Sequence, residues 1–136
     1  MNALFETFKP EGFSNLNTYL FADQPELLIS FLKQSFDAEE KSRSIREDTN
    51  ELANCILKIG DTCFMISQAS GVFSGMRTCF YLYVSDVDLV YKRAIRNGAK
   101  SVFEAANMDY GDRQAGVEDP FGNYWWISER LVQADY

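Results

Sequence analysis

The sequence contains no histidine among its 136 residues. Histidine is the commonest metal ligand in proteins and the commonest general base near neutral pH. A metal site or an acid–base catalytic site in this protein would therefore have to use other residues. Cysteine is also sparse, because Cys55, Cys63 and Cys79 are an odd number without Cys-x-x-Cys spacing. This pattern is typical of reduced, mostly buried thiols rather than of a disulfide framework or a zinc site. A nucleophilic Cys79 would need a carboxylate or an amine as its base.

Clustered positive charge and long apolar runs are the next absences. The 20 acidic and 13 basic residues give a net charge of −7, and no Lys/Arg cluster forms the positive footprint that phosphate groups require. We therefore expect neither a nucleic acid nor an anionic membrane surface as a partner. No stretch approaches the roughly 18 consecutive apolar residues of a membrane span, and residues 1–10 lack the pattern of a signal peptide. These absences predict a cytoplasmic protein.

Apolar and aromatic side chains are abundant. Hydrophobic residues make up 46% of the sequence and aromatic residues 15%, a composition far from that of disordered chains. A chain of this length predicts a single domain over residues 1–136 with a substantial core. Residues 1–15 show no clear period, and we expect them to form an extended arm with Phe5, Phe8 and Phe13 as its anchors.

Two similar modules, about residues 16–70 and 76–130, are expected to follow the arm. Each predicts the order β-α-β-β-β, because apolar residues recur at helical spacing in one segment and alternate in the others. The fold class is therefore α+β. The expected elements are strands over 16–22, 39–50, 53–59, 62–68, 77–84 and 101–106, helices over about 23–36 and 85–97, and a closing hairpin around Asp119-Pro120-Phe121-Gly122-Asn123.

Side chains that point away from the helices are expected to line a cleft between the modules. The alternation along each strand assigns to this set Cys79, Tyr81, Tyr83, Tyr124, Trp126 and Ser128, together with Leu16, Thr18 and Leu20 of the first module. The set expected under the helices is Asn17, Tyr19, Phe21, Phe80, Leu82, Val84, Trp125 and Ile127. The predicted cleft is therefore aromatic.

A family resemblance rests on the duplicated module and on the second half of the chain. Its motifs are Gly98-Ala99, Gly111-Asp112-Arg113 and the run Asp119-Pro120-Phe121-Gly122-Asn123-Tyr124-Trp125-Trp126-Ile127. With these motifs the chain resembles the vicinal oxygen chelate superfamily of glyoxalases, bleomycin-resistance proteins and extradiol dioxygenases, and within it the PhnB-like branch. The resemblance covers residues 16–128. It implies two modules forming a cup-shaped mixed sheet with helices on the outer face, usually a homodimer, and, in the enzymes, a divalent metal in the cup.

The metal ligands that the resemblance implies can be located in this sequence. They fall on Leu16, Cys79 and Trp126 and, for a further ligand of the PhnB-like branch, on Asn54. None of these residues is a histidine or a carboxylate, whereas a divalent metal needs at least three converging N, O or S donors. We therefore expect no metal and no cofactor, and metal-dependent catalysis is disfavoured.

Three functions stay open at this point. The first is a metal-free cup that binds a small aromatic or amphipathic molecule, with the acidic net charge favouring a cationic one. The second is a divergent lyase, isomerase or dioxygenase-like enzyme whose catalytic residues are unknown, with Glu118, Asp109 and Tyr110 as candidates for its acid or base. The third is a non-catalytic dimeric scaffold whose own side chains fill the cup.

Most of the candidate ligand-binding residues carry rings. The full set is Trp126, Tyr81, Tyr83, Tyr124, Cys79, Asn54 and Arg113. Trp125 has the opposite parity and is expected in the core. Arg113 could contact an anionic ligand group or pair with a nearby carboxylate of Asp112, Glu118 or Asp119. Asp119 itself is expected to hold the turn by accepting backbone N–H hydrogen bonds.

Overall fold

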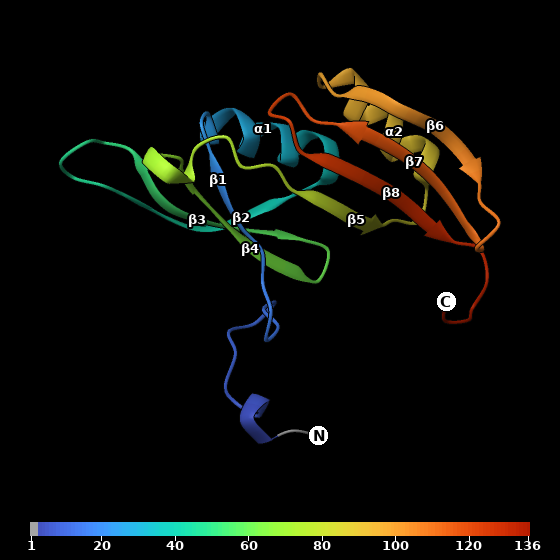
Figure 1. Cartoon of the computed structure of the whole chain (residues 1–136), viewed down its shortest axis with the longest axis horizontal. Helices are drawn as coiled ribbons and strands as arrows, with labels where there is room; N and C mark the ends of the chain where they lie inside the picture. Colours follow the sequence, from blue (N-terminus) through green and yellow to red (C-terminus); the bar gives the residue numbers. More distant parts are fainter. Residues whose placement is uncertain (1–2) are drawn as a thin grey trace. The chain divides into compact units, whose positions relative to one another are not determined.

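The computed structural model of the protein describes residues 3–136 and contains two four-stranded sheets (Figure 1). The strand order is β1-β4-β3-β2 in the first sheet and β5-β8-β7-β6 in the second. The pairs β1–β4 and β5–β8 are parallel, and the other pairs are antiparallel. In chain order the elements are η1 (Ala3–Phe5), β1 (Tyr19–Ala22), α1 (Pro25–Phe36), β2 (Glu39–Ile45), β3 (Leu52–Ile59), β4 (Thr62–Gln68), η2 (Gly71–Phe73), β5 (Cys79–Tyr83), α2 (Val87–Arg96), β6 (Lys100–Asn107), β7 (Asp112–Glu118) and β8 (Tyr124–Arg130).

This order confirms the α+β class and the duplicated β-α-β-β-β pattern. Strand β4 has the predicted bounds, and the polar segment after α1 does form a strand, although β2 ends at Ile45 rather than at Asn50. Strands β1 and β5 are shorter than expected. Within the described residues, no helix is long and apolar enough to cross a membrane.

The described chain divides into two compact units. One unit combines residues 3–25 with 37–76 and contains the first sheet, and the other combines residues 26–36 with 77–136 and contains the second sheet. Most of α1 therefore groups with the second sheet, where the ring of Phe36 lies 4.7 Å from that of Trp125.

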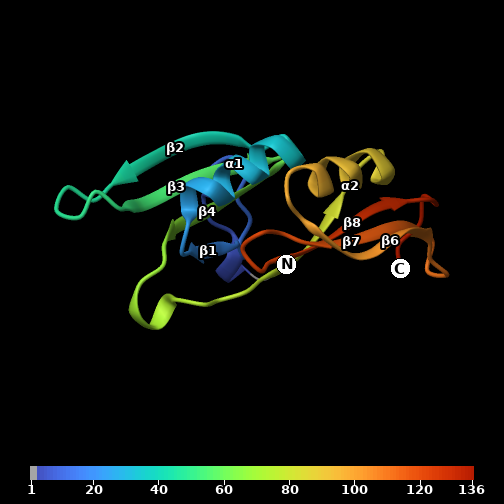
Figure 2. The same ribbon diagram turned by 90° about the horizontal axis from the view of Figure 1, so that it is seen from above.

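Helix α2 covers one face of the second sheet and contacts β6, β7 and β8 (Figure 2). Asp86 caps the helix, because its side chain accepts a hydrogen bond from Leu89 N at 3.1 Å. Gly98 follows the helix with φ 105°, a conformation that a Cβ would disfavour. On the covered side of β8, Trp125 and Ile127 are buried as the alternation predicted.

The turn between β7 and β8 is organised by Asp119, which is buried. Its Oδ1 accepts hydrogen bonds from Phe121 N at 2.9 Å and Asn123 N at 3.0 Å. Its Oδ2 accepts one from Trp125 Nε1 at 3.0 Å. The predicted role in the turn is confirmed, and the same carboxylate also satisfies the buried indole N–H of the core.

The predicted faces of the first strand are wrong. Leu20 and Ala22 are buried, whereas Tyr19 is 45% exposed and stacks on Phe21 with ring centroids 4.9 Å apart. The prediction aligned the two modules on Asp23 and Asp86, but the helices begin at Pro25 and Val87, so the true offset is one residue shorter. A slip of one residue moves every side chain of a strand to the other face.

Candidate functional site

Aromatic side chains gather on the face of the second sheet that α2 leaves uncovered. Tyr81 and Tyr83 project from β5 with ring centroids 5.3 Å apart and are 46% and 54% exposed. Trp126 on β8 is the register partner of Tyr81, and its ring lies 6.1 Å from that of Tyr124. We call this surface the open face. It consists of Cys79, Tyr81, Tyr83, Tyr124, Trp126, Ser128 and Arg130, together with Asp112, Gln114, Gly116 and Glu118 on β7.

One end of the open face is apolar. Trp126 is half-buried and meets Phe103 of β6 edge-on, with ring centroids 5.4 Å apart. Gly116 leaves room for this ring, because a Cβ added there would come within 2.8 Å of Phe103 Cδ1. Phe103 can therefore lie against Trp126 because Gly116 on the neighbouring strand has no side chain.

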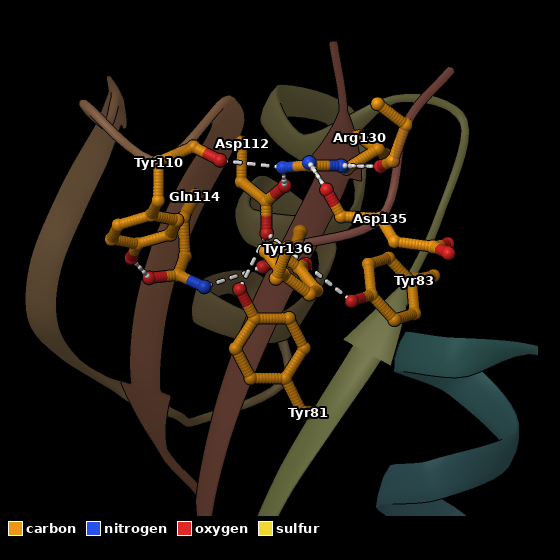
Figure 3. A network of polar contacts seen from close by, with 10 residues as sticks. Tyr81, Tyr83, Tyr110, Asp112, Gln114, Arg130, Asp135 and Tyr136 are labelled. Atoms are coloured by element: carbon orange, nitrogen blue, oxygen red, sulfur yellow. Dashed lines mark hydrogen bonds and ion pairs between the residues drawn. The ribbon is translucent and has the colours of Figure 1, made fainter. Parts of the chain in front are cut away.

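The other end is polar and centres on Asp112, whose side chain has no exposed surface (Figure 3). Its Oδ1 accepts a hydrogen bond from Arg130 Nη1 at 3.0 Å. Its Oδ2 accepts hydrogen bonds from the hydroxyls of Tyr81 at 2.5 Å and Tyr136 at 2.7 Å. Burial by itself raises the pKa of Asp112, but the hydrogen bonds from Tyr136, Tyr81 and Arg130 together hold it below its ordinary value. The carboxylate is therefore ionised and acts as a fixed acceptor.

Arg130 links this carboxylate to the segment that follows β8. Its Nε donates to Ala134 O at 2.9 Å and its Nη2 to Asp135 O at 3.2 Å. Its Cζ also lies 4.2 Å from the centroid of the Tyr136 ring, a cation–π geometry. Arg130 thus holds residues 131–136 against the polar end of the open face.

Tyr110 and Gln114 extend the polar network along β7. Gln114 Nε2 donates to Ser128 Oγ at 2.6 Å, and the Tyr110 hydroxyl donates to Gln114 Oε1. Burial raises the pKa of Tyr110, and the nearby Tyr81, Asp112 and Asp109 add to that rise. Tyr110 therefore keeps its proton at neutral pH and does not provide a general base there.

Two of the predicted ligand-binding residues lie away from this face. Arg113 points from β7 toward α2 and forms a bidentate ion pair with Asp88, with Nε–Oδ2 and Nη2–Oδ1 distances of 2.9 Å. Its partner is thus none of the three carboxylates considered from the sequence. Asn54 belongs to the other unit, where its Nδ2 lies 3.5 Å from the Tyr19 hydroxyl.

The donors at the family's ligand positions do not fit a divalent metal. Cys79 is an exposed thiol beside Tyr124, and Trp126 offers no metal-binding atom. With the corrected offset, the counterpart of Cys79 is Asn17, whose Oδ1 already accepts a hydrogen bond from Ser14 N at 2.8 Å. Across residues 3–136, no three His, Cys, Asp or Glu side chains come together as a metal-binding group.

The polar half of this site was not predicted from the sequence. Arg130 follows Trp126 and Ser128 at intervals of two, and Asp112 opposes Arg130 in the register of β7 and β8. Extending the strand alternation to residue 130 would have found Arg130. Nothing in the sequence pattern pointed to Tyr136, because it lies beyond the last strand.

The fold is shared with proteins of known structure, although no family model matches the sequence. An uncharacterised protein of Mycobacterium tuberculosis is 29% identical, with 88% of this chain and 76% of the relative covered. TioX from Micromonospora superposes with a TM-score of 0.69 at 21% identity, covering 85% of this chain and 99% of TioX.

Two further structures carry family names. A glyoxalase/bleomycin resistance protein/dioxygenase family enzyme from Burkholderia phytofirmans gives a TM-score of 0.67 at 20% identity, with 85% of this chain and 97% of the enzyme covered. A PhnB protein from Bacillus cereus gives 0.65 at 14% identity, with 84% and 98% covered. The chain has the vicinal oxygen chelate fold that these proteins share, as the resemblance predicted.

Proposed function

We propose that the open face binds a small aromatic or amphipathic molecule without a metal ion. The observation that carries this proposal is the gathering of Tyr81, Tyr83, Tyr124 and Trp126 on one face of a single sheet, with two of the rings about half exposed. Aromatic rings bury large areas when they pack, so leaving several of them accessible to water suits a surface that packs against a ligand.

The polar network supports binding because it can orient a ligand. Small-molecule sites combine an apolar lining with a few fixed polar groups that determine orientation. Here Trp126 and Phe103 form the apolar end, and the ion pair of Asp112 with Arg130 forms the polar end. Both ends lie within the unit of the second sheet. The proposal therefore depends on one unit alone.

The proposed ligand is bound by stacking and hydrogen bonding alone. Cys79 and Trp126 stand where the family's enzymes place metal ligands, and one carboxylate of the face, Asp112, is already engaged by Arg130 and two hydroxyls. Stacking on exposed tyrosine rings favours a planar compound, and the net charge of −7 favours a cationic one.

Replacement of Trp126 tests this function. A thermal-shift screen of berberine, tyramine and p-cresol should raise the melting temperature of the wild type, because a ligand at 100-fold its dissociation constant stabilises a protein by about 2.7 kcal/mol. Trp126→Ala should need at least a tenfold higher ligand concentration for the same shift in melting temperature. Tyr91→Ala on α2 should leave the shift unchanged. A broad aromatic panel with no shift in the wild type would contradict the proposal.

The homodimer, the cytoplasmic location and the single-domain organisation stay predictions from the sequence. Light scattering of the purified protein tests the first, and cell fractionation tests the second. The third is tested by calorimetry, because one cooperative domain should unfold in one two-state transition. Two separate transitions would instead assign independent stability to the two units.

A further inference from the structure

We propose that the polar end of the open face is a recognition site for a phenolic hydroxyl group, and that Tyr136 of the chain itself occupies this site when no ligand is bound. The proposal rests on the function proposed above and narrows the ligand to a class: an aromatic compound that carries a hydroxyl group on its ring. It also assigns residues 131–136 the role of an intramolecular competitor.

The contacts of Tyr136 show what the site recognises. Its hydroxyl donates a hydrogen bond to Asp112 Oδ2 at 2.7 Å and also meets the hydroxyl of Tyr83 (Figure 3). Its ring lies against the guanidinium of Arg130, with Cζ 4.2 Å from the centroid. Both halves of a phenol are therefore contacted: the hydroxyl by a carboxylate, and the ring by a planar cation.

The site is fixed before any phenol enters it. Asp112 has no exposed surface, and its two oxygens are held by Arg130 from one side and by the Tyr81 hydroxyl from the other. A buried carboxylate with a spare lone pair accepts hydrogen bonds and repels anions. It therefore selects a donor such as a phenol over an ether, and over a carboxylate on the same ring.

Tyr136 is held in a way that allows a ligand to replace it. The residue remains 73% exposed, and residues 131–136 form no helix or strand. Besides the contacts of Tyr136, the segment is held by hydrogen bonds from Arg130 to Ala134 O and Asp135 O and by one from Leu131 N to Gly111 O. Release of Tyr136 therefore opens no core, and local segments of this kind open at low free energy.

The experiment compares p-cresol with 4-methylanisole, which has the same ring but a methoxy group in place of the hydroxyl. Calorimetry or tryptophan fluorescence would measure both affinities in the wild type, in Tyr136→Ala and in Tyr136→Phe. In Tyr136→Ala, p-cresol should bind about tenfold or more tightly than in the wild type, because the competing hydroxyl is gone, and about tenfold more tightly than 4-methylanisole. Tyr136→Phe should fall between the two proteins.

A second variant separates recognition from competition. Asp112→Asn in the Tyr136→Ala background should remove most of the preference for p-cresol over 4-methylanisole. If that protein does not fold, Tyr81→Phe in the same background should still reduce the preference, because it removes a donor that orients Asp112. Val132→Ala is the control, because it changes a side chain of residues 131–136 but leaves the Tyr136 hydroxyl in place.

The outcomes distinguish this inference from the proposed function. Equal affinity for p-cresol and 4-methylanisole in Tyr136→Ala would overturn the phenol site while leaving aromatic binding to the open face intact. A preference for the phenol that Tyr136→Ala does not strengthen would overturn the competitor role. If neither compound binds to Tyr136→Ala, the phenol site is overturned, and the proposed function is then decided by the wider aromatic panel and Trp126→Ala.

Discussion

Among single residues, Asp112 connects stability to pH. Its pKa is held below the ordinary value in the folded protein, so its contribution to stability is present above the unfolded pKa and is lost as the pH falls through the folded one. Asp112→Asn should therefore be less stable than the wild type at pH 7, and the gap should narrow below about pH 4. Urea unfolding at a series of pH values measures this gap.

Asp88→Asn is the matched control for that measurement. The pKa of Asp88 is also lowered, mainly by its hydrogen bond from Arg113, but its side chain is 50% exposed. Solvent screens exposed pairs, so this variant should show a much smaller gap across the same pH range. Equal pH profiles for the two variants would contradict a larger contribution of the buried Asp112 to the free energy of unfolding.

Asp119 carries a prediction of its own at this scale. Asp119→Ala leaves the N–H groups of Phe121, Asn123 and Trp125 without their acceptor, and we expect a loss of about 3 kcal/mol in the free energy of unfolding. Asp119→Asn keeps one acceptor oxygen, which can serve only some of these N–H groups. Its free energy of unfolding should therefore lie between those of the wild type and Asp119→Ala. Chemical denaturation monitored by tryptophan fluorescence gives both values, and a loss below about 1 kcal/mol for Asp119→Ala would contradict this role.

The sequence predicted single residues well where one short-range rule decided them. Asp119 was identified from turn chemistry, and Trp125 was separated from Trp126 by alternation alone. The partner of Arg113 was not predictable in this way, because Asp88 lies 25 positions away in the chain and reaches it only once α2 packs on β7. Side-chain pairs between elements depend on a packing geometry that the local pattern does not contain.

At the scale of the element, strand β1 shows how a one-residue slip changes a prediction. The structure places Leu20 in the core at 5% exposure and leaves Tyr19 at 45%. Leu20→Ala should therefore lower the free energy of unfolding by about 2–4 kcal/mol, as expected for a buried leucine. Tyr19→Phe should cost under about 1 kcal/mol, because it removes only a hydroxyl bonded to Ser67. Equal losses in urea unfolding would contradict these faces.

The elements themselves were more predictable than their alignment. Helix ends followed from local signals, since Asp86 caps α2 and Gly98 follows its end. The relation between the modules required a choice of which residues to superpose, and the matching aspartates suggested the wrong one. The two aspartates are not equivalent, because Asp23 stands two residues before Pro25, the first residue of α1, whereas Asp86 directly precedes Val87, the first residue of α2. A one-residue shift in the alignment leaves both elements intact and still reverses the inferred faces.

At the scale of the whole molecule, the duplicated order of elements is retained among similar structures even where sequence identity is low. Structures that share 14–21% identity with this chain superpose over about 85% of it. Alternation and capping preserve such an arrangement while the side chains on an open face change. A position where the resemblance implies a metal ligand in the enzymes can therefore hold Trp126 here.

The net charge of −7 acts on ligands through the field of the whole molecule. Tyramine and p-cresol share a phenol ring, but only tyramine carries an ammonium group, so we expect tyramine to bind more tightly at low salt. That advantage should shrink severalfold as the ionic strength rises from about 0.02 M to 0.5 M, because the Debye length falls below about 5 Å. Calorimetric titration at several salt concentrations measures it, with p-cresol as the control for salt effects on the ring. If 4-hydroxyphenylacetate bound better than tyramine at low salt, Arg130 rather than the overall charge would set the preference.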